Sequence, residues 1–201
     1  MTLLLIVTLK LCSVFLLYNE ARTGGYQLND FVLKMIPPRD VSIPLFIVNW
    51  IGIIMGILIT VRKPKGAMAL FIAVMIIVVM RALSMFFVPL MPPEGIVPLR
   101  DPFLEFSFYG DKVLLRDLFF SGHTASLAVL YFFVDIKPAK YIIAVAGVIV
   151  GVLLLVSHVH YTIDIIAAPF FAYVAYLLGT KLSAKIASKF VPIEKVKAVL
   201  T

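Results

Sequence analysis

Charged residues and cysteine are both scarce in this sequence of 201 residues. Only 14% of the residues are charged, whereas about a quarter of a soluble domain usually is; 62% are hydrophobic, and the mean hydropathy is +1.07. Cys12 is the single cysteine and lies inside an apolar run, which excludes an intrachain disulfide and a metal cluster built from cysteines. The composition excludes a sizeable soluble domain and indicates an integral membrane protein.

Basic residues outnumber acidic ones by 18 to 11, which gives a net charge of +7. Such a charge could serve nucleic-acid binding, but the lysines fall in short loops and in the tail rather than on a face with aromatic side chains. Contact with anionic lipid headgroups explains them better. We therefore expect the lipid bilayer, and no nucleic acid, among the partners.

Long apolar runs are what the sequence has in abundance. A bilayer core of about 30 Å needs roughly 20 apolar residues per helix, so the chain allows at most about six or seven crossings. Six apolar segments can be drawn, at residues 2–18, 43–61, 67–90, 118–134, 141–157 and 160–179. We predict an all-α integral membrane protein, a bundle of six transmembrane helices in which residues 1–201 form a single domain.

Residues 2–18 are the least certain of these segments. They contain Lys10 and could be a signal peptide, but they have no basic start and no convincing small-residue cleavage site before "YNEARTGG". We expect a retained helix.

The charges between the segments predict an orientation. The two short loops and the tail carry ten basic residues, whereas the longer loops 19–42 and 91–117 carry six among eight acids. The positive-inside rule puts the short loops and both termini in the cytoplasm and the long loops outside. The ten basic residues are Arg62, Lys63, Lys65, Lys137, Lys140, Lys181, Lys185, Lys189, Lys195 and Lys197.

All three histidines of the chain fall near the outer ends of the last three apolar segments. Segments 118–134 and 160–179 run in the same direction, so their starts, "SGHT" and "HVHYTID", lie on the same side of the membrane whatever the orientation. The polar groups with catalytic potential therefore gather at one interface.

In "HYTID", His160 and Asp164 are four residues apart, which on a helix puts them on one face with Cβ atoms about 5 to 6 Å apart. A carboxylate there can hold the proton of one ring nitrogen and leave the other nitrogen free as a nucleophile or general base. The alternative is that Asp164 only neutralises a polar spot. Ionisable groups in membrane spans are costly and usually functional, which favours the first interpretation.

In "SGHT", Ser121 is a candidate N-cap and Gly122 leaves the first backbone amides of the helix uncovered. A helix start of this kind favours anions. His123 would then lie beside a bound phosphate as a proton donor; the alternative is an ordinary cap with an interfacial histidine.

Two imidazoles, a carboxylate and a helix start together suggest phosphoryl transfer through a phosphohistidine, with no metal or other cofactor required. His160 would attack phosphorus, Asp164 would orient it, and His123 would protonate the leaving oxygen. Arg81 interrupts an apolar run and should be buried in the bundle or in a headgroup cavity, or else snorkel to the interface. The cations available for the phosphate are Arg81, Arg100, Lys112 and Arg116.

At these residues the sequence resembles the sphingomyelin synthase branch of the type-2 phosphatidic acid phosphatase superfamily. "DLFFSGHT" and "HVHYTID" match the two motifs of that branch, and Arg81 matches an arginine in its third span. The resemblance implies a single transmembrane lipid phosphatase/phosphotransferase domain, a catalytic triad of His123, His160 and Asp164, an extracytoplasmic active site, and lipid substrates that enter sideways from the bilayer. Further candidates are Ser121, Gly122, Arg81, Arg116 and Tyr161 for phosphate binding, with Asp117, Thr124 and His158 in support.

The leading hypothesis is a phosphotransferase that moves a phospho-headgroup from a glycerophospholipid to a lipid hydroxyl of the ceramide or diacylglycerol type, or to water. One alternative is a lipid phosphate phosphatase, although the lysine-arginine-proline and serine-arginine motifs of other lipid phosphatases are absent. A second is a zinc site of His123, His160 and Asp164. A third is a non-enzymatic lipid transporter, whose midplane path would offer few polar residues beyond Lys10 and Asn49.

Overall fold

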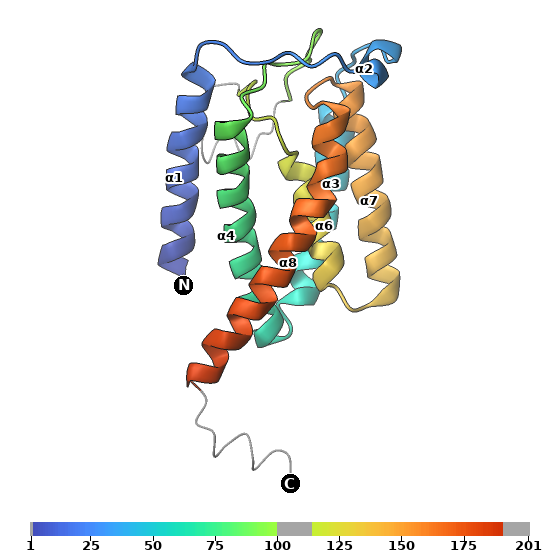
Figure 1. Ribbon diagram of the computed structural model, residues 1–201. Coiled ribbons are helices and arrows are strands. Elements are labelled where there is room, and N and C mark those ends of the chain that lie inside the picture. Colours follow the sequence, from blue (N-terminus) through green and yellow to red (C-terminus); the bar gives the residue numbers. More distant parts are fainter. Residues whose placement is uncertain (1, 100–113, 191–201) are drawn as a thin grey trace.

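A computed structural model describes residues 2–99 and 114–190 of the protein (Figure 1). These residues form seven helices and no strand; one isolated bridge pairs Tyr26 with Leu90. The all-α prediction is therefore confirmed for the described residues. The helices are α1 (Thr2–Ala21), α2 (Phe31–Met35), α3 (Ser42–Thr60), α4 (Pro64–Phe87), α6 (Gly122–Phe133), α7 (Lys137–Val156) and α8 (Thr162–Phe190).

Four of the helices in residues 2–99 and 114–190 are long and apolar enough to cross a membrane, namely α3, α4, α7 and α8. The protein is a multi-pass integral membrane protein. The helix α6 has only 12 residues, or about 18 Å at 1.5 Å per residue, and the helix α1 is not among the four. The count of six transmembrane helices thus stays a prediction.

Local sequence explains where three of the helices begin. Pro64 and Pro138 lie in the first turns of α4 and α7, where a missing N–H is not needed. Ser121 is the N-cap of α6, as predicted, and its Oγ accepts a hydrogen bond from the Thr124 N–H at 3.4 Å. This cap starts the helix four residues later than the predicted segment 118–134.

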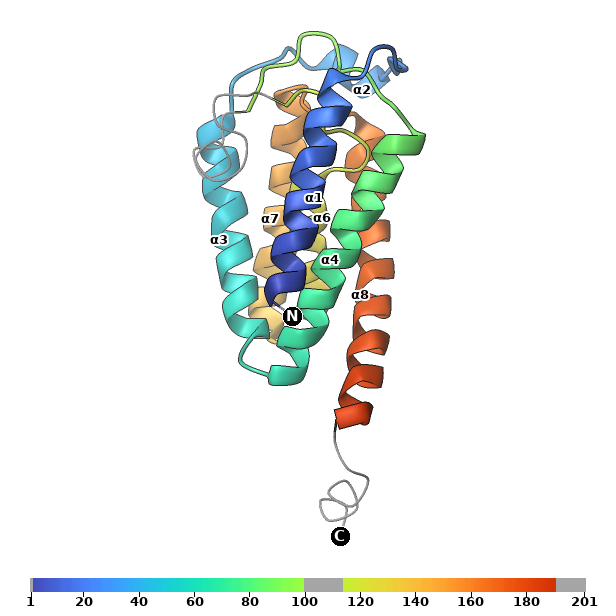
Figure 2. The ribbon, with the colours of Figure 1, turned by 90° about the vertical axis from the view of Figure 1, so that its left-hand side faces the viewer.

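The helices stand side by side, with α2 and the long connections gathered at one end (Figures 1 and 2). The first residues of α1 and the last turns of α8 lie at the other end. The short helix α6 packs against four neighbours, α3, α4, α7 and α8. Helices α6 and α8 both start at the end with the connections, as the sequence analysis expects.

The outward face of α3 is apolar along its length. Its exposed side chains recur every three or four residues, which marks a single stripe on one side of the helix. They are Ile43, Ile47, Ile51, Ile54 and Leu58. A stripe of this composition suits contact with lipid chains and would be unfavourable in water.

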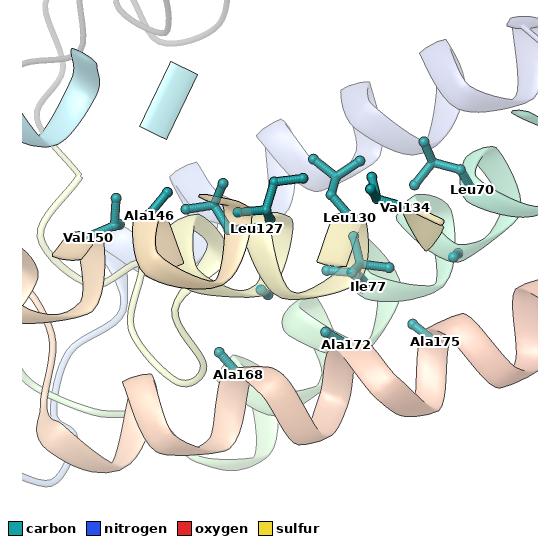
Figure 3. Close-up of a cluster of buried hydrophobic side chains, with 14 of the residues drawn as sticks. Leu70, Ile77, Leu127, Leu130, Val134, Ala146, Val150, Ala168, Ala172 and Ala175 are labelled. Atoms are coloured by element: carbon teal, nitrogen blue, oxygen red, sulfur yellow. The ribbon is translucent and has the colours of Figure 1, made fainter. Parts of the chain in front are cut away.

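The inward face of α8 is built from small residues. Ala168, Ala172 and Ala175 are fully buried and form a row along α8 within the main hydrophobic cluster (Figure 3). One turn further, Gly179 lies so close to α4 that a Cβ atom there would be 2.7 Å from the Ala69 carbonyl oxygen. Small side chains let two helix backbones approach closely, which is how helices associate in lipid.

We predict that Gly179→Ala lowers stability, because the added methyl group would also lie 2.9 Å from the Ala73 Cβ. The expected loss is about 1–3 kcal/mol of unfolding free energy, measured by thermal unfolding in detergent. Gly147→Ala on α7 is the matched control, since the nearest atom to its new Cβ is 3.8 Å away. Equal melting temperatures for the two variants would contradict the close approach of α4 and α8.

Candidate active site

The structure brings His160 and Asp164 together. The Nδ1 atom of His160 lies 3.2 Å from the Asp164 Oδ2, and both residues are almost completely buried. The contact arises differently from the sequence prediction: α8 begins at Thr162, so His160 precedes the helix. The Tyr161 N–H donates to the same oxygen at 3.1 Å, which fixes the carboxylate at the turn. An N–H at Nδ1 directed to Asp164 leaves Nε2 of His160 with its lone pair.

The same aspartate joins α8 to the start of α6. Its backbone carbonyl accepts a hydrogen bond from the Ser121 N–H at 3.2 Å. Ser121 is fully buried and sits one residue before α6. The two motifs that the sequence analysis places on one side of the membrane are therefore in direct contact.

Arg81 of α4 also reaches the start of α6. Its Nε donates to the Phe120 carbonyl at 3.0 Å, and its Nη2 pairs with the Asp117 carboxylate at 2.5 Å. A Cβ atom on Gly122 would lie 2.5 Å from the Arg81 Nη1, so a larger residue there would displace the guanidinium from this position. Asp117 thus holds the arginine, and through it the turn before α6.

A cavity of about 380 Å³ connects these groups. His123, His160, Arg81, Asp117 and Gly122 all line it. The ring of His123 packs against Phe46 of α3, with 5.9 Å between centroids. Two imidazoles, a cation and the first residue of a helix therefore face one space.

The other candidates surround this cavity without lining it. Ser121 and Thr124 form the buried cap of α6. The Arg116 guanidinium donates to the Gly24 carbonyl at 2.6 Å, away from the cavity. Arg100 and Lys112 lie outside the described residues.

Tyr161 and His158 hold the connections at this end of the bundle in place through contacts with backbone carbonyls. The Tyr161 hydroxyl donates to the Met91 carbonyl at 2.9 Å. His158 has a φ of 55° and lies with its two ring nitrogens each 2.8 Å from a backbone carbonyl oxygen, those of Glu94 and Ile36. Both residues line a second cavity of about 730 Å³ among the connections, which His123 and His160 do not reach.

Asp30 is a structural residue of the site that sequence reasoning missed. Its carboxylate accepts hydrogen bonds from the Thr162 N–H at 2.6 Å and the Thr162 hydroxyl at 3.0 Å. It also caps α2 through the N–H groups of Val32 and Leu33. The N-cap pattern in "NDFVLKM" was readable from the sequence, but its second partner, 132 residues away, was not.

Within residues 2–99 and 114–190, no group of three or more His, Cys, Asp or Glu side chains is arranged to hold a metal ion. The Nδ1 of His160 and the Oδ2 of Asp164 are hydrogen-bonded to each other.

Comparison with known proteins gives a match over this part of the chain. The family model described as PAP2 superfamily C-terminal matches residues 116–181, which contain His123, His160 and Asp164. The resemblance is confirmed. The matched residues carry both motifs, and the relatives below are named as phosphatidylcholine:ceramide cholinephosphotransferases.

Human phosphatidylcholine:ceramide cholinephosphotransferase 2 is 34% identical over 85 residues, which are 38% of this chain and 20% of the relative. The Macaca fascicularis protein of that name is 33% identical over 85 residues, with the same shares. A Caenorhabditis elegans protein named as a candidate phosphatidylcholine:ceramide cholinephosphotransferase 3 is 42% identical over 64 residues, which are 29% of this chain and 19% of the relative. The match thus spans about a fifth of the length of these relatives. No solved structure gives a significant match.

We predict that Asp30→Ala, which removes the hydrogen bonds to Thr162 at the start of α8, destabilises the protein by about 1–2 kcal/mol at neutral pH. Burial raises the pKa of Asp30, but the hydrogen bonds from Thr162, Leu33 and Val32 outweigh burial and hold this pKa below its usual value. The stability that the charged carboxylate contributes is therefore complete above the unfolded value of about 4, and is lost as the pH falls through the lower folded value.

Thermal unfolding in detergent between pH 3 and pH 7 tests this. Asp30→Asn keeps an oxygen acceptor without the charge, so its difference from the unsubstituted protein should shrink toward low pH. A difference that stays constant across that range would show that the charge of Asp30 contributes nothing.

Proposed function

We propose that this protein is a membrane lipid phosphotransferase. It moves a phospho-headgroup from a glycerophospholipid to a lipid hydroxyl of the ceramide or diacylglycerol type, with hydrolysis when water is the acceptor. The observation that carries the proposal is that His123 and His160 line one cavity beside Arg81, with Asp164 bonded to His160. The names of the relatives, which are cholinephosphotransferases, support the same class of reaction.

In the first step, Nε2 of His160 attacks the phosphorus of the donor lipid. A P–N bond forms and the P–O bond to the glycerolipid breaks, with its electron pair on the leaving oxygen. Protonated His123 gives that oxygen a proton, which releases diacylglycerol. The Asp164 carboxylate, 3.2 Å from Nδ1, keeps the ring oriented and stabilises its positive charge.

The second step reverses these roles. Neutral His123 takes the proton of the acceptor hydroxyl, whose oxygen attacks the phosphorus while the P–N bond breaks. The electron pair returns to Nε2 of His160, which is free for another cycle. The protons and bonds balance over the two steps, and no oxidant, metal or other cofactor is required.

The negative charge of the phosphate needs positive partners in a site of low dielectric constant. Arg81 and the start of α6 at Gly122 supply them, because both line the cavity next to His123. In this proposal, residues that do not line the cavity keep these groups in position, namely Ser121, Thr124, Tyr161 and His158. Arg116 donates a hydrogen bond to the Gly24 carbonyl, and in this proposal it fixes the chain that leads into α6.

The charges at the two ends of the bundle support a proposed orientation in the membrane. The α3–α4 turn, the start of α7 and the last turns of α8 lie at the end opposite to the site (Figure 2). Of the ten basic residues predicted to face the cytoplasm, eight lie there, and Lys195 and Lys197 fall outside the described residues. By the positive-inside rule, this distribution supports the proposal that the site is extracytoplasmic and both termini are cytoplasmic.

We predict headgroup transfer that depends on a lipid acceptor. Purified protein would be incubated with a phospholipid labelled in its headgroup, with and without ceramide or diacylglycerol. Labelled product that forms with the acceptor is the expected result. Release of inorganic phosphate from phosphatidic acid, with no acceptor-dependent product, would instead make the protein a lipid phosphate phosphatase.

His160→Ala should abolish transfer and hydrolysis, and Asp164→Asn should lower kcat by roughly 10²- to 10⁴-fold. A brief reaction with donor lipid labelled at phosphorus should leave alkali-stable, acid-labile label on the protein, and none on His160→Ala. Asp135→Asn is the control, because its exposed ion pair with Lys63 lies at the other end of the bundle. Unchanged turnover in His160→Ala would overturn the phosphohistidine mechanism.

Exhaustive chelation should leave the transfer rate unchanged, since the proposed chemistry uses only imidazoles, a carboxylate and a guanidinium. Activity would be measured after treatment with a strong chelator and its removal by gel filtration. Loss of activity that added zinc restores would support the zinc alternative instead.

A further inference from the structure

Asn49 is a buried polar residue that the proposed mechanism does not use. It lies on α3, lines the 380 Å³ cavity and is only 3% exposed. Its Oδ1 atom has no hydrogen-bond partner among the described residues. A buried acceptor left unpaired costs stability, so its presence in the wall of a cavity points to a partner supplied by a ligand.

The position of Asn49 says which part of a ligand it meets. Helix α3 runs inward from the end that carries the connections (Figure 2). Asn49 is three residues beyond Phe46, which contacts His123, and so lies about 4.5 Å deeper along the axis. It is therefore below the groups that would hold the phosphate.

The cavity wall at greater depth is mostly apolar; Ser126 of α6 also lines it, with its hydroxyl donated to the Gly122 carbonyl. On α4, Val78 and Val74 line the cavity one and two turns inward from Arg81, and Ile53 does so one turn inward from Asn49. A lipid bound with its reacting oxygen near His123 would put its chains against these residues. Asn49 would face the few atoms of the lipid backbone that lie between the reacting oxygen and the acyl chains.

We propose that Asn49 is a specificity-determining residue whose Oδ1 accepts a hydrogen bond from an N–H or O–H of the lipid backbone, next to the reacting oxygen. The inference rests on the proposed function, since it assumes a lipid in this cavity. An N-acylated amino-alcohol lipid carries an amide N–H and a second hydroxyl at that place. The ester groups of diacylglycerol offer only acceptors there and would leave Oδ1 unpaired.

Binding can be measured without turnover in the His160→Ala background. Trp50 is the single tryptophan of the chain and lines the same cavity, so its fluorescence reports occupancy. The probes are a short-chain ceramide and dioctanoylglycerol, titrated into the full chain in detergent. We expect Asn49→Leu to weaken ceramide binding roughly tenfold or more and to change dioctanoylglycerol binding less than about twofold.

Two further variants sharpen the comparison. Asn49→Asp keeps an acceptor oxygen in place and should retain the preference for ceramide, and Asn49→Ser, too short to reach, should lose it even if Asn49→Leu does not fold. Asn29→Leu makes the same change at an exposed asparagine outside this cavity and should leave both affinities unchanged. The ratio of the two dissociation constants is the decisive readout, because a purely structural defect would weaken the binding of both lipids to the same extent.

A ratio that Asn49→Leu and Asn49→Ser leave unchanged would overturn the inference. So would selective loss of dioctanoylglycerol, which would mean that the amide donates to an ester. If the unsubstituted protein transfers no headgroup but the ratio still depends on Asn49, the proposed function fails and the lipid specificity stands. If the protein transfers the headgroup to both acceptors and the ratio does not depend on Asn49, the proposed function stands and this inference fails.

Discussion

The hydrogen bond between the Ser121 N–H and the Asp164 carbonyl is the contact on which the arrangement of the site depends. It joins the start of α6 to the first turn of α8, across 43 residues of chain. Ser121 also caps the helix that carries His123, and Asp164 also holds His160. One backbone contact therefore sets the separation of the two imidazoles, and both sides of it are buried where water cannot compete.

The surrounding elements hold this contact in place. Arg81 brings α4 to the same helix start through the Phe120 carbonyl and Asp117. Asp30 brings the first long connection to Thr162 at the start of α8. Farther along, the small residues of α8 and Gly179 let α4 and α8 pack closely. The site thus sits where the long helices α4 and α8, the short α6 and the first long connection are joined by buried and partly buried polar contacts.

Much of this could be predicted from sequence because it is local or follows from helix direction. The cap at Ser121 and the approach of the two motifs followed from spacing and the alternation of spans. The pairing of His160 with Asp164 was expected from helical spacing, but it forms at the turn before α8, where His160 precedes the helix. Apolar runs located the helices but not their ends. The helix α8 continues to Phe190 because lysine, alanine and leucine favour a helix after the apolar run stops.

The long-range contacts could not be read in the same way. Arg81 and Asp117 are 36 residues apart, and Asp30 and Thr162 are 132 apart, so no periodicity connects them. Nor does the sequence show that Asn49, one polar residue in an apolar helix, faces the same cavity as the histidines. These facts depend on how the helices are rotated about their axes, which packing decides.

The shortness of α6 has an energetic consequence for substrate capture. It has eight residues fewer than α7, which begins only four residues after α6 ends, so its start is recessed by up to about 12 Å from the far end of α7. Moving an acyl chain into water costs about 0.8 kcal/mol for each methylene. For two long chains, the total is far larger than the binding free energy that a small site can supply. A recessed helix start lets the headgroup descend to the protein while the chains stay in hydrocarbon, and that cost of extraction never arises.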